Sequence, residues 1–225
     1  ALAKEYFSEW DAHTIRIGYT PTCDDAFELF FDDKKTDERK NYLLNEYDAE
    51  ASIDYSTEAT SMSKFMRLDM SHHCYADTKR SLASVIDGFK PSQRKCMWTM
   101  LAKDIVQDKK VVSVAALASD FTSYHHGEVS MIELVCCLAR DFVGSNNLAL
   151  LVPEGMFGDR NCTEHAAARY IFTRLDPIAR ALFPKADDSS LTYEFDDETQ
   201  IEPTYLVPVI PLVLVNGTRG IGTGW

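Results

Sequence analysis

The sequence predicts an α+β fold that is mainly helical and contains a helix-turn-helix followed by a wing. Apolar residues recur at helical spacing in residues 111–123 and 130–143, and a short turn with a glycine separates the two stretches. A brief apolar run, 148–152, follows and is ended by proline and glycine, which is typical of a strand and its loop. Any helical hairpin fits the two helices alone, so the expected strand pair behind them is what favours a winged helix.

Composition predicts a soluble, intracellular protein. The 225 residues are 45% hydrophobic, which is enough to bury a substantial core. The longest apolar run, 205–215, contains Pro208 and Pro211 and is too short to cross a membrane, and the N-terminus has no signal-peptide pattern. The six cysteines have no repeated spacing and no C-x-x-C, so we expect reduced thiols and neither a zinc site nor disulfides.

The net charge of −12 is unevenly distributed. Residues 1–60 hold 15 acidic and 6 basic side chains, and residues 185–202 hold 7 acidic and 1 basic. Residues 61–184 hold 15 basic and 13 acidic side chains. Because phosphate binding relies on Lys and Arg, a nucleic-acid surface is expected only in this middle segment. Solvated acidic faces account for the flanks.

Three helical patterns and a linker open the chain. The helical patterns cover residues 3–14, 23–31 and 34–43, and residues 46–63 are rich in Asp, Ser, Thr and Ala, which favours a linker. Residues 65–70 suit a short helix or an extended arm. The adjacent residues His72, His73 and Cys74 invite a metal site, but ligands on one helix face need a spacing of three or four, so none is expected there.

A helix is expected from Pro91 to Lys103, after a helix end at Gly88. Its first turn contains Arg94 and Lys95, and cations there oppose the helix dipole. A phosphate bound at the helix N-terminus, where free backbone N–H groups point, would explain their placement.

Tyr170 is the main candidate for chemistry. Residues 160–170 are a polar loop that runs into a small apolar turn and ends in an Arg-Tyr pair. A phenol has a pKa of about 10, so an attacking tyrosine needs a base, a metal-bound phosphate or a cation that favours the phenolate. Arg169 is such a cation, and its guanidinium also suits a phosphate. The alternative is an aromatic anchor beside a solvated cation at the start of an amphipathic helix.

After Tyr170 we expect a helical core stripe that restarts with Asp176 as its N-cap and Pro177 as its first residue. Residues 191–195 and 204–215 read as β structure. Residues 216–224 contain four glycines but follow no βαβ unit, so a nucleotide site is not expected. The residues of the helical stripe are Ile171, Leu175, Ile178 and Leu182.

Five blocks of sequence carry a family resemblance. They are D-G-F-K-P-S-Q-R-K (87–95), S-Y-H-H-G-E (123–128), F-V-G-S-N-N-L (142–148), A-A-A-R-Y-I-F-T (166–173) and N-G-T-R-G-I-G-T-G-W (216–225). In this order, and at nearly this spacing, they resemble the DNA breakage-reunion region of type II DNA topoisomerases of the eukaryotic and large-virus type. The resemblance is loose over residues 1–45 and close over residues 77–225.

The resemblance implies a set of site residues. Tyr170, beside Arg169, becomes covalently joined to a DNA 5′-phosphate. His125 and His126 lie near the scissile phosphate, where one of them hydrogen-bonds the DNA or helps with proton transfer. Ile221 matches an isoleucine that wedges between base pairs and bends the duplex. The other implied DNA contacts are basic: Arg80, Lys90, Arg94 and Lys95.

The resemblance also implies a domain order. Residues 1–63 are expected to be a helical linker that follows a metal-binding acidic domain, 64–185 the winged-helix breakage-reunion domain, and 186–225 the start of a β-rich tower domain. The chain is expected to be an excised fragment, because the acidic domain and the ATPase domain are not in it. Alone, we expect it to bind DNA weakly and not to cleave.

The implied activity is ATP-dependent passage of one DNA duplex through a double-strand break in another, by a homodimer with one tyrosine per strand. Mg²⁺ and ATP are the implied cofactors of the full-length enzyme, with ligands outside this chain. Double-stranded DNA is the implied partner, and no membrane is involved. The implied location is the nucleus, or a cytoplasmic replication site if the protein is viral.

One departure from the family keeps two alternatives open. The loop before Tyr170 is about two residues shorter than in the family and lacks its Gly pair and Lys, for which His165 or Asn161 is a candidate replacement. A topoisomerase relative that has lost activity fits this departure. A non-catalytic winged-helix DNA-binding module is the other alternative, and it requires Tyr170 to be buried in the core.

Overall fold

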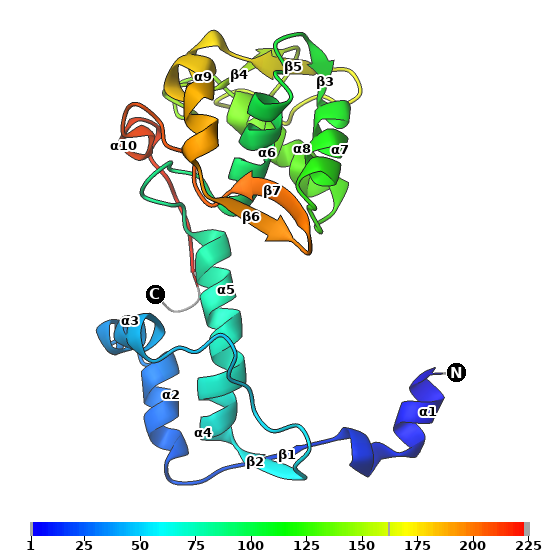
Figure 1. Ribbon diagram of the computed structural model, residues 1–225, viewed down its shortest axis with the longest axis vertical. Helices are drawn as coiled ribbons and strands as arrows, with labels where there is room; N and C mark the ends of the chain where they lie inside the picture. Colours follow the sequence, from blue (N-terminus) through cyan, green and yellow to red (C-terminus); the bar gives the residue numbers. More distant parts are fainter. Residues whose placement is uncertain (1, 162, 223–225) are drawn as a thin grey trace. The chain divides into compact units, whose positions relative to one another are not determined.

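The computed structural model describes residues 2–161 and 163–222, and the chain divides into two compact units (Figure 1). The first unit comprises residues 1–81 with 221–225, and the second comprises residues 82–220. Cys162 and the last three residues of the glycine-rich segment, 223–225, lie outside the described residues. None of the helices in the described part of the chain combines the length and the apolar character needed to cross a membrane.

The first unit is mostly helical. Its elements are α1 (Leu2–Ser8), η1 (Trp10–His13), β1 (Arg16–Gly18), α2 (Cys23–Phe31), α3 (Thr36–Asn45), β2 (Ala59–Ser61), α4 (Met62–Phe65), η2 (Met66–Met70) and α5 (Ser71–Ser81). The three expected helical patterns are therefore confirmed, although the first is interrupted by one residue. The expected linker hides a strand, because β2 pairs in parallel with β1. Three-residue strands leave too little alternation to be detected from sequence.

Residues 62–81 differ from the expected domain boundary. The elements α4, η2 and α5 follow one another without a break, and Met66 and Cys74 are buried against Phe30 and Tyr42. The two residues are eight positions apart, which places them on one helix face. The Tyr42 hydroxyl also donates to the Arg67 carbonyl at 2.6 Å. Residues 64–81, expected in the winged-helix domain, are thus part of the first unit.

The second unit holds the expected winged helix. Its elements are α6 (Pro91–Ala102), β3 (Lys109–Lys110), α7 (Val111–Phe121), α8 (Glu128–Ala139), β4 (Leu151–Glu154), β5 (Phe172–Leu175), α9 (Pro177–Leu182), η3 (Lys185–Ser190), β6 (Tyr193–Asp196), β7 (Thr199–Pro203) and α10 (Leu212–Asn216). The wing is an antiparallel sheet with strand order β3-β5-β4. Figure 1 shows this sheet and the β6–β7 hairpin on opposite sides of α6, α7 and α8.

Helices α6, α7 and α8 form the centre of this unit. Six consecutive residues of α6, Cys96 to Leu101, are buried, so this helix is covered on all sides. Helices α7 and α8 each bury one stripe, with Val114 and Ala118 on α7 and Val135 and Ala139 on α8. Buried residues four apart share a helix face, which is why the apolar spacing predicted both helices.

The helical stripe expected after Tyr170 is wrong in its first half. Residues 172–175 form β5, in which Thr173 and Leu175 are buried and Phe172 and Arg174 are half-buried. This alternation is the period of a strand that covers a core on one face. The second half is confirmed, because Asp176 Oδ1 accepts the Ile178 backbone N–H at 2.9 Å and caps α9.

The β structure expected for residues 204–215 is also wrong. Strand β7 ends at Pro203, and the chain continues without regular structure to α10. Pro208 and Pro211 have no N–H to donate to a strand ladder, which disfavours pairing here. Leu206 and Leu212 are buried in the same core as α6, so residues 186–220 pack within the second unit.

Candidate functional site

Tyr170 lies at the surface of the second unit. It ends the turn 168–170 that precedes β5, and its side chain is 67% exposed. The Tyr170 backbone N–H donates to the Ala167 carbonyl at 2.8 Å, which closes this turn. The hydroxyl is therefore accessible, and the buried position that a purely structural tyrosine requires is not observed.

Arg169 is exposed beside Tyr170. Its guanidinium carbon lies 4.8 Å from the centroid of the Tyr170 ring, a cation-π arrangement. The guanidinium thus covers the ring face, and it is accessible to an anion that approaches the tyrosine.

The start of α7 holds the turn that carries Tyr170. The backbone N–H of Val111 donates to the Ile171 carbonyl at 3.0 Å, and that of Val112 donates to the Ala168 carbonyl at 3.2 Å. Free N–H groups of a helix N-terminus need such acceptors. The position of Tyr170 is therefore fixed by a helix that begins about 60 residues earlier in the chain.

His125 and His126 are not brought next to Tyr170, which corrects the expected cluster. Both imidazoles are exposed in the turn after α7, whereas Tyr170 lies at its start. With 11 residues and about 1.5 Å of rise per residue, α7 separates these places by roughly 16 Å. His125 Nε2 lies 3.9 Å from Asp196 Oδ2 at the end of β6, and the His126 ring contacts Tyr124 edge-on at 5.2 Å.

Arg94 and Lys95 are engaged within the fold rather than exposed for phosphate. Arg94 is buried and pairs with Asp87, its Nε lying 2.6 Å from Oδ2. Lys95 Nζ donates to Glu202 Oε2 at 2.8 Å and to the Thr122 carbonyl at 2.6 Å. The cations that oppose the dipole of α6 are thus balanced by internal carboxylates, a partner that spacing alone does not reveal.

The remaining predicted DNA contacts lie nearer to solvent. Lys90 is half-buried in front of α6, where its backbone N–H donates to Gln93 Oε1 at 2.9 Å. In the first unit, Arg80 is exposed and pairs with Asp77 at 2.6 Å, and Ile221 is 83% exposed. An exposed isoleucine is available as a wedge, so that role stays a prediction.

Helix α8 anchors the irregular loop that leads from β4 to Tyr170. Arg140 Nε donates to the Phe157 carbonyl at 2.9 Å. His165 Nε2 lies 2.7 Å from Glu133 Oε1, and its Nδ1 lies 2.7 Å from the Ala166 carbonyl. The Ala166 carbonyl and the Glu133 carboxylate raise the pKa of His165 against the opposing effect of burial. His165, a candidate replacement for the missing family residues, thus ties this loop to α8.

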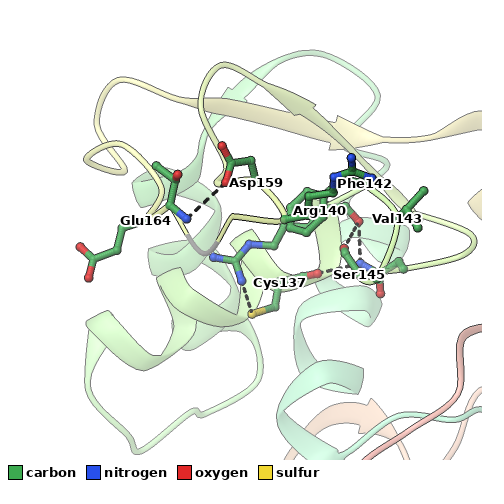
Figure 2. A pocket seen from close by; sticks show the side chains of 11 residues that line it. Cys137, Arg140, Phe142, Val143, Ser145, Asp159 and Glu164 are labelled. Atoms are coloured by element: carbon green, nitrogen blue, oxygen red, sulfur yellow. Dashed lines mark hydrogen bonds between the residues drawn. The ribbon is translucent and has the colours of Figure 1, made fainter.

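A pocket of about 580 Å³ lies between the end of α8 and this loop. Figure 2 shows Cys137 and Arg140 of α8 on one side and Asp159 of the loop on the other. The Asp159 carboxylate accepts from the backbone N–H of Asn161 at 2.8 Å, which folds the loop over the pocket. Tyr170 and Arg169 are not among the residues that line it.

Metal and thiol chemistry find little support in the described residues. Within residues 2–161 and 163–222, no three His, Cys, Asp or Glu side chains converge as a metal site would require. The five described cysteines are free thiols. Burial raises the pKa of both Cys96 and Cys136 to about 12, so these two thiols stay protonated at neutral pH.

Two basic residues near Tyr170 are absent from the predicted site. Lys109 and Lys110 form β3, both are exposed, and their strand pairs with β5 directly after Tyr170. The available signal is a Lys-Lys pair before an apolar helical pattern. Nothing local to that pair indicates which distant segment it will meet.

Comparison with known proteins agrees with this geometry. Residues 80–225 match the family model for DNA gyrase/topoisomerase IV, and residues 1–78 match the C-terminal associated domain of TOPRIM. The DNA topoisomerase 2 of Candida glabrata is 42% identical over 98% of this chain, and DNA topoisomerase 2-alpha of Mus musculus is 40% identical over 99%. A crystal structure of the Plasmodium falciparum topoisomerase II DNA-binding, cleavage and re-ligation domain matches 99% of this chain with a TM-score of 0.77 and 36% identity.

The chain belongs to the DNA gyrase/topoisomerase IV family. Within that family it is a piece of a type II DNA topoisomerase. It spans 16% of the length of the two curated relatives named above and 31% of the Plasmodium chain.

Proposed function

We propose that the protein to which this chain belongs breaks and rejoins duplex DNA, with Tyr170 as the nucleophile. One observation carries this proposal: the Tyr170 side chain is 67% exposed next to an exposed Arg169, on a turn that α7 holds in place. The likeness to a structure titled as a DNA-binding, cleavage and re-ligation domain supports it. A tyrosine with only a packing role has no need of this exposure.

The proposed step is a transesterification. The Tyr170 oxygen loses its proton to a base and bonds to a DNA phosphorus, while the bond from that phosphorus to the 3′ oxygen breaks and this oxygen takes up a proton. The new link is a 5′-phosphotyrosine ester. Because one phosphate ester replaces another, resealing needs no added energy. Arg169 would balance the charge that develops on the phosphate oxygens.

For the full-length protein we propose ATP-dependent passage of a second duplex, in a homodimer with one Tyr170 per strand. The proposed place of action is the nucleus, or a cytoplasmic replication site if the protein is viral. Mg²⁺ and ATP belong to this proposal as cofactors of the full-length protein. The described residues offer no cluster that fits a Mg²⁺ ion, so the chemistry assigned to this chain rests on its own side chains.

Covalent capture of DNA tests the proposal. The full-length protein, incubated with radiolabelled duplex and denatured, should retain label, and Tyr170→Phe should retain none. Tyr205→Phe is the matched control, because Tyr205 is also an exposed tyrosine of the second unit. Capture that survives in Tyr170→Phe contradicts the assignment. A wild-type protein that binds duplex without capture favours the non-catalytic module or the inactive relative.

A further inference from the structure

We propose that Lys110 binds a DNA phosphate beside Tyr170, so that Lys110, Arg169 and Tyr170 form one phosphate-binding surface. This inference rests on the proposed function and adds to it a residue for which the sequence offered histidines instead. Those histidines lie at the other end of α7, which leaves the tyrosine without its expected neighbours.

The backbone places Lys110 next to the tyrosine turn. Lys110 lies opposite Phe172 in the antiparallel pair of β3 and β5, two residues after Tyr170. The next residue, Val111, is tied to the same segment, because its N–H donates to the Ile171 carbonyl at 3.0 Å. Directly opposed residues of an antiparallel pair have Cβ atoms about 4.5–5.5 Å apart, so the Lys110 side chain begins within reach of this turn.

Lys110 and Tyr170 share a face of the sheet. Ile171, Thr173 and Leu175 are at most 3% exposed and cover the core. Tyr170 and Phe172 alternate with them and point to the outer face. Because opposed residues point to the same face, Lys110 lies on the outer face with Phe172. Lys109 is opposed to the buried Thr173 and belongs to the other face.

The charges near Tyr170 favour an anion. No carboxylate partner of Lys110 or Arg169 is found within the described residues, and both side chains are exposed. The two carboxylates nearest in the sheet, Asp108 and Glu154, are both engaged by Arg174. Elsewhere in the unit, by contrast, the cations Arg94, Lys95 and Arg180 pair with carboxylates. The cations left over are those beside the tyrosine.

The ligand that this surface fits is a phosphate of a nucleic-acid strand. An ammonium and a guanidinium on either side of a phenol can bind the non-bridging oxygens of one phosphate by charge-assisted hydrogen bonds. The ammonium would also favour the phenolate form of the attacking group. Lys110 moves no proton in this role, and it is a binding residue for the phosphate.

Salt dependence of duplex binding tests the inference in the full-length protein. Each phosphate contact contributes about 0.9 to the slope of log K against log salt concentration, so Lys110→Gln should lower that slope by about 1. Lys109→Gln is the matched control, because it makes the same charge change one residue away on the other face. Lys110→Arg should keep the slope. An unchanged slope in Lys110→Gln, or equal losses in both glutamine variants, overturns the inference.

Covalent capture separates this inference from the proposed function. Lys110→Gln should slow capture by about 100-fold, the usual loss when one donor to a developing anion is removed, and Lys109→Gln should slow it much less. If Tyr170→Phe still captures DNA, the proposed function fails whatever the lysines do. If only Tyr170→Phe loses capture and Lys110→Gln behaves as the wild type, the function stands and the lysine assignment fails.

Discussion

The Nε atom of Arg94 lies 2.6 Å from Oδ2 of Asp87, and both side chains are buried. Nη2 of the same guanidinium donates to the other Asp87 oxygen at 3.1 Å and to the Phe89 carbonyl at 3.0 Å. Asp87 also accepts the backbone N–H groups of Phe89 and Leu206, each at 2.9 Å. This pair therefore joins the first turn of α6 to the segment before it and to the chain after β7.

Removal of the Arg94 charge should destabilise the second unit strongly. Arg94→Gln leaves the Asp87 carboxylate buried without its counterion, a change that typically costs about 3–5 kcal/mol. Arg160→Gln is the control at an exposed arginine, for which a change within about 0.5 kcal/mol is expected. The measurement is the free energy of unfolding in urea. A loss below about 1 kcal/mol in Arg94→Gln would show that the pair contributes little.

The cap of α9 should be worth about 1 kcal/mol. Asp176→Ala removes the carboxylate that accepts the Ile178 N–H at 2.9 Å, and it leaves that donor unsatisfied. Asp176→Asn keeps an oxygen at the same place and should retain most of the stability. Urea unfolding of the two variants distinguishes them. Equal losses in both would mean that the charge, and not the hydrogen bond, is what Asp176 supplies.

The contact between His165 and Glu133 should make stability depend on pH. Both imidazole nitrogens face acceptors, and only the protonated ring can donate to both at once. The Ala166 carbonyl is the larger cause of the raised pKa of His165, and Glu133 adds to it. A raised pKa in the folded state stabilises the protein fully below the unfolded value of about 6.5 and progressively less as the pH rises through the folded value.

The difference in unfolding free energy between wild type and His165→Gln should therefore shrink from about pH 5.5 to about pH 8.5. Glu133→Gln should reduce this pH dependence without abolishing it, because the Ala166 carbonyl still accepts from the ring. A difference that is flat over this range, or that grows with pH, would show that His165 is neutral in the folded protein.

Sequence patterns predicted the helices well because their signals are local. The four-residue spacing in α7 and α8 and the carboxylate before Pro177 each lie within one turn of the structure that they specify. Strand β5 was missed because Ile171, Leu175, Ile178 and Leu182 fit a helical period, while its true partners lie about 20 residues away in β4. Single-sequence reasoning has no access to that pairing.

The candidate site divided in the same way. The family blocks drew attention to Tyr170, Arg169 and the histidines by residue type, but side-chain partners depend on tertiary contacts. Arg94 reads as a free cation until the carboxylate of Asp87 is placed against it. Lys110 reads as an ordinary surface lysine until β3 is paired with β5. Residue type was thus predictable here, whereas the engagement of each charge was not.

Gly155 should be essential to the seating of the residue before β5. Its φ is +113°, and a Cβ at this position would lie 2.8 Å from Cγ2 of Ile171, which is buried next to Tyr170. Gly155→Ala therefore adds a backbone cost of about 1–2 kcal/mol and a packing cost of about 1–3 kcal/mol. Gly144→Ala is the matched control, because its φ is +94° and a Cβ there meets nothing within 4 Å.

The two variants separate backbone strain from displacement of the tyrosine turn. Gly144→Ala should lose only the backbone cost in urea unfolding, and the full-length variant should capture DNA at the wild-type rate. Gly155→Ala should lose more stability and also slow capture, because Ile171 must shift and its carbonyl holds the turn to α7 through Val111. Equal stability losses would mean that Ile171 yields freely. Slowed capture in Gly144→Ala would mean that the loop matters to the tyrosine in some other way than through Ile171.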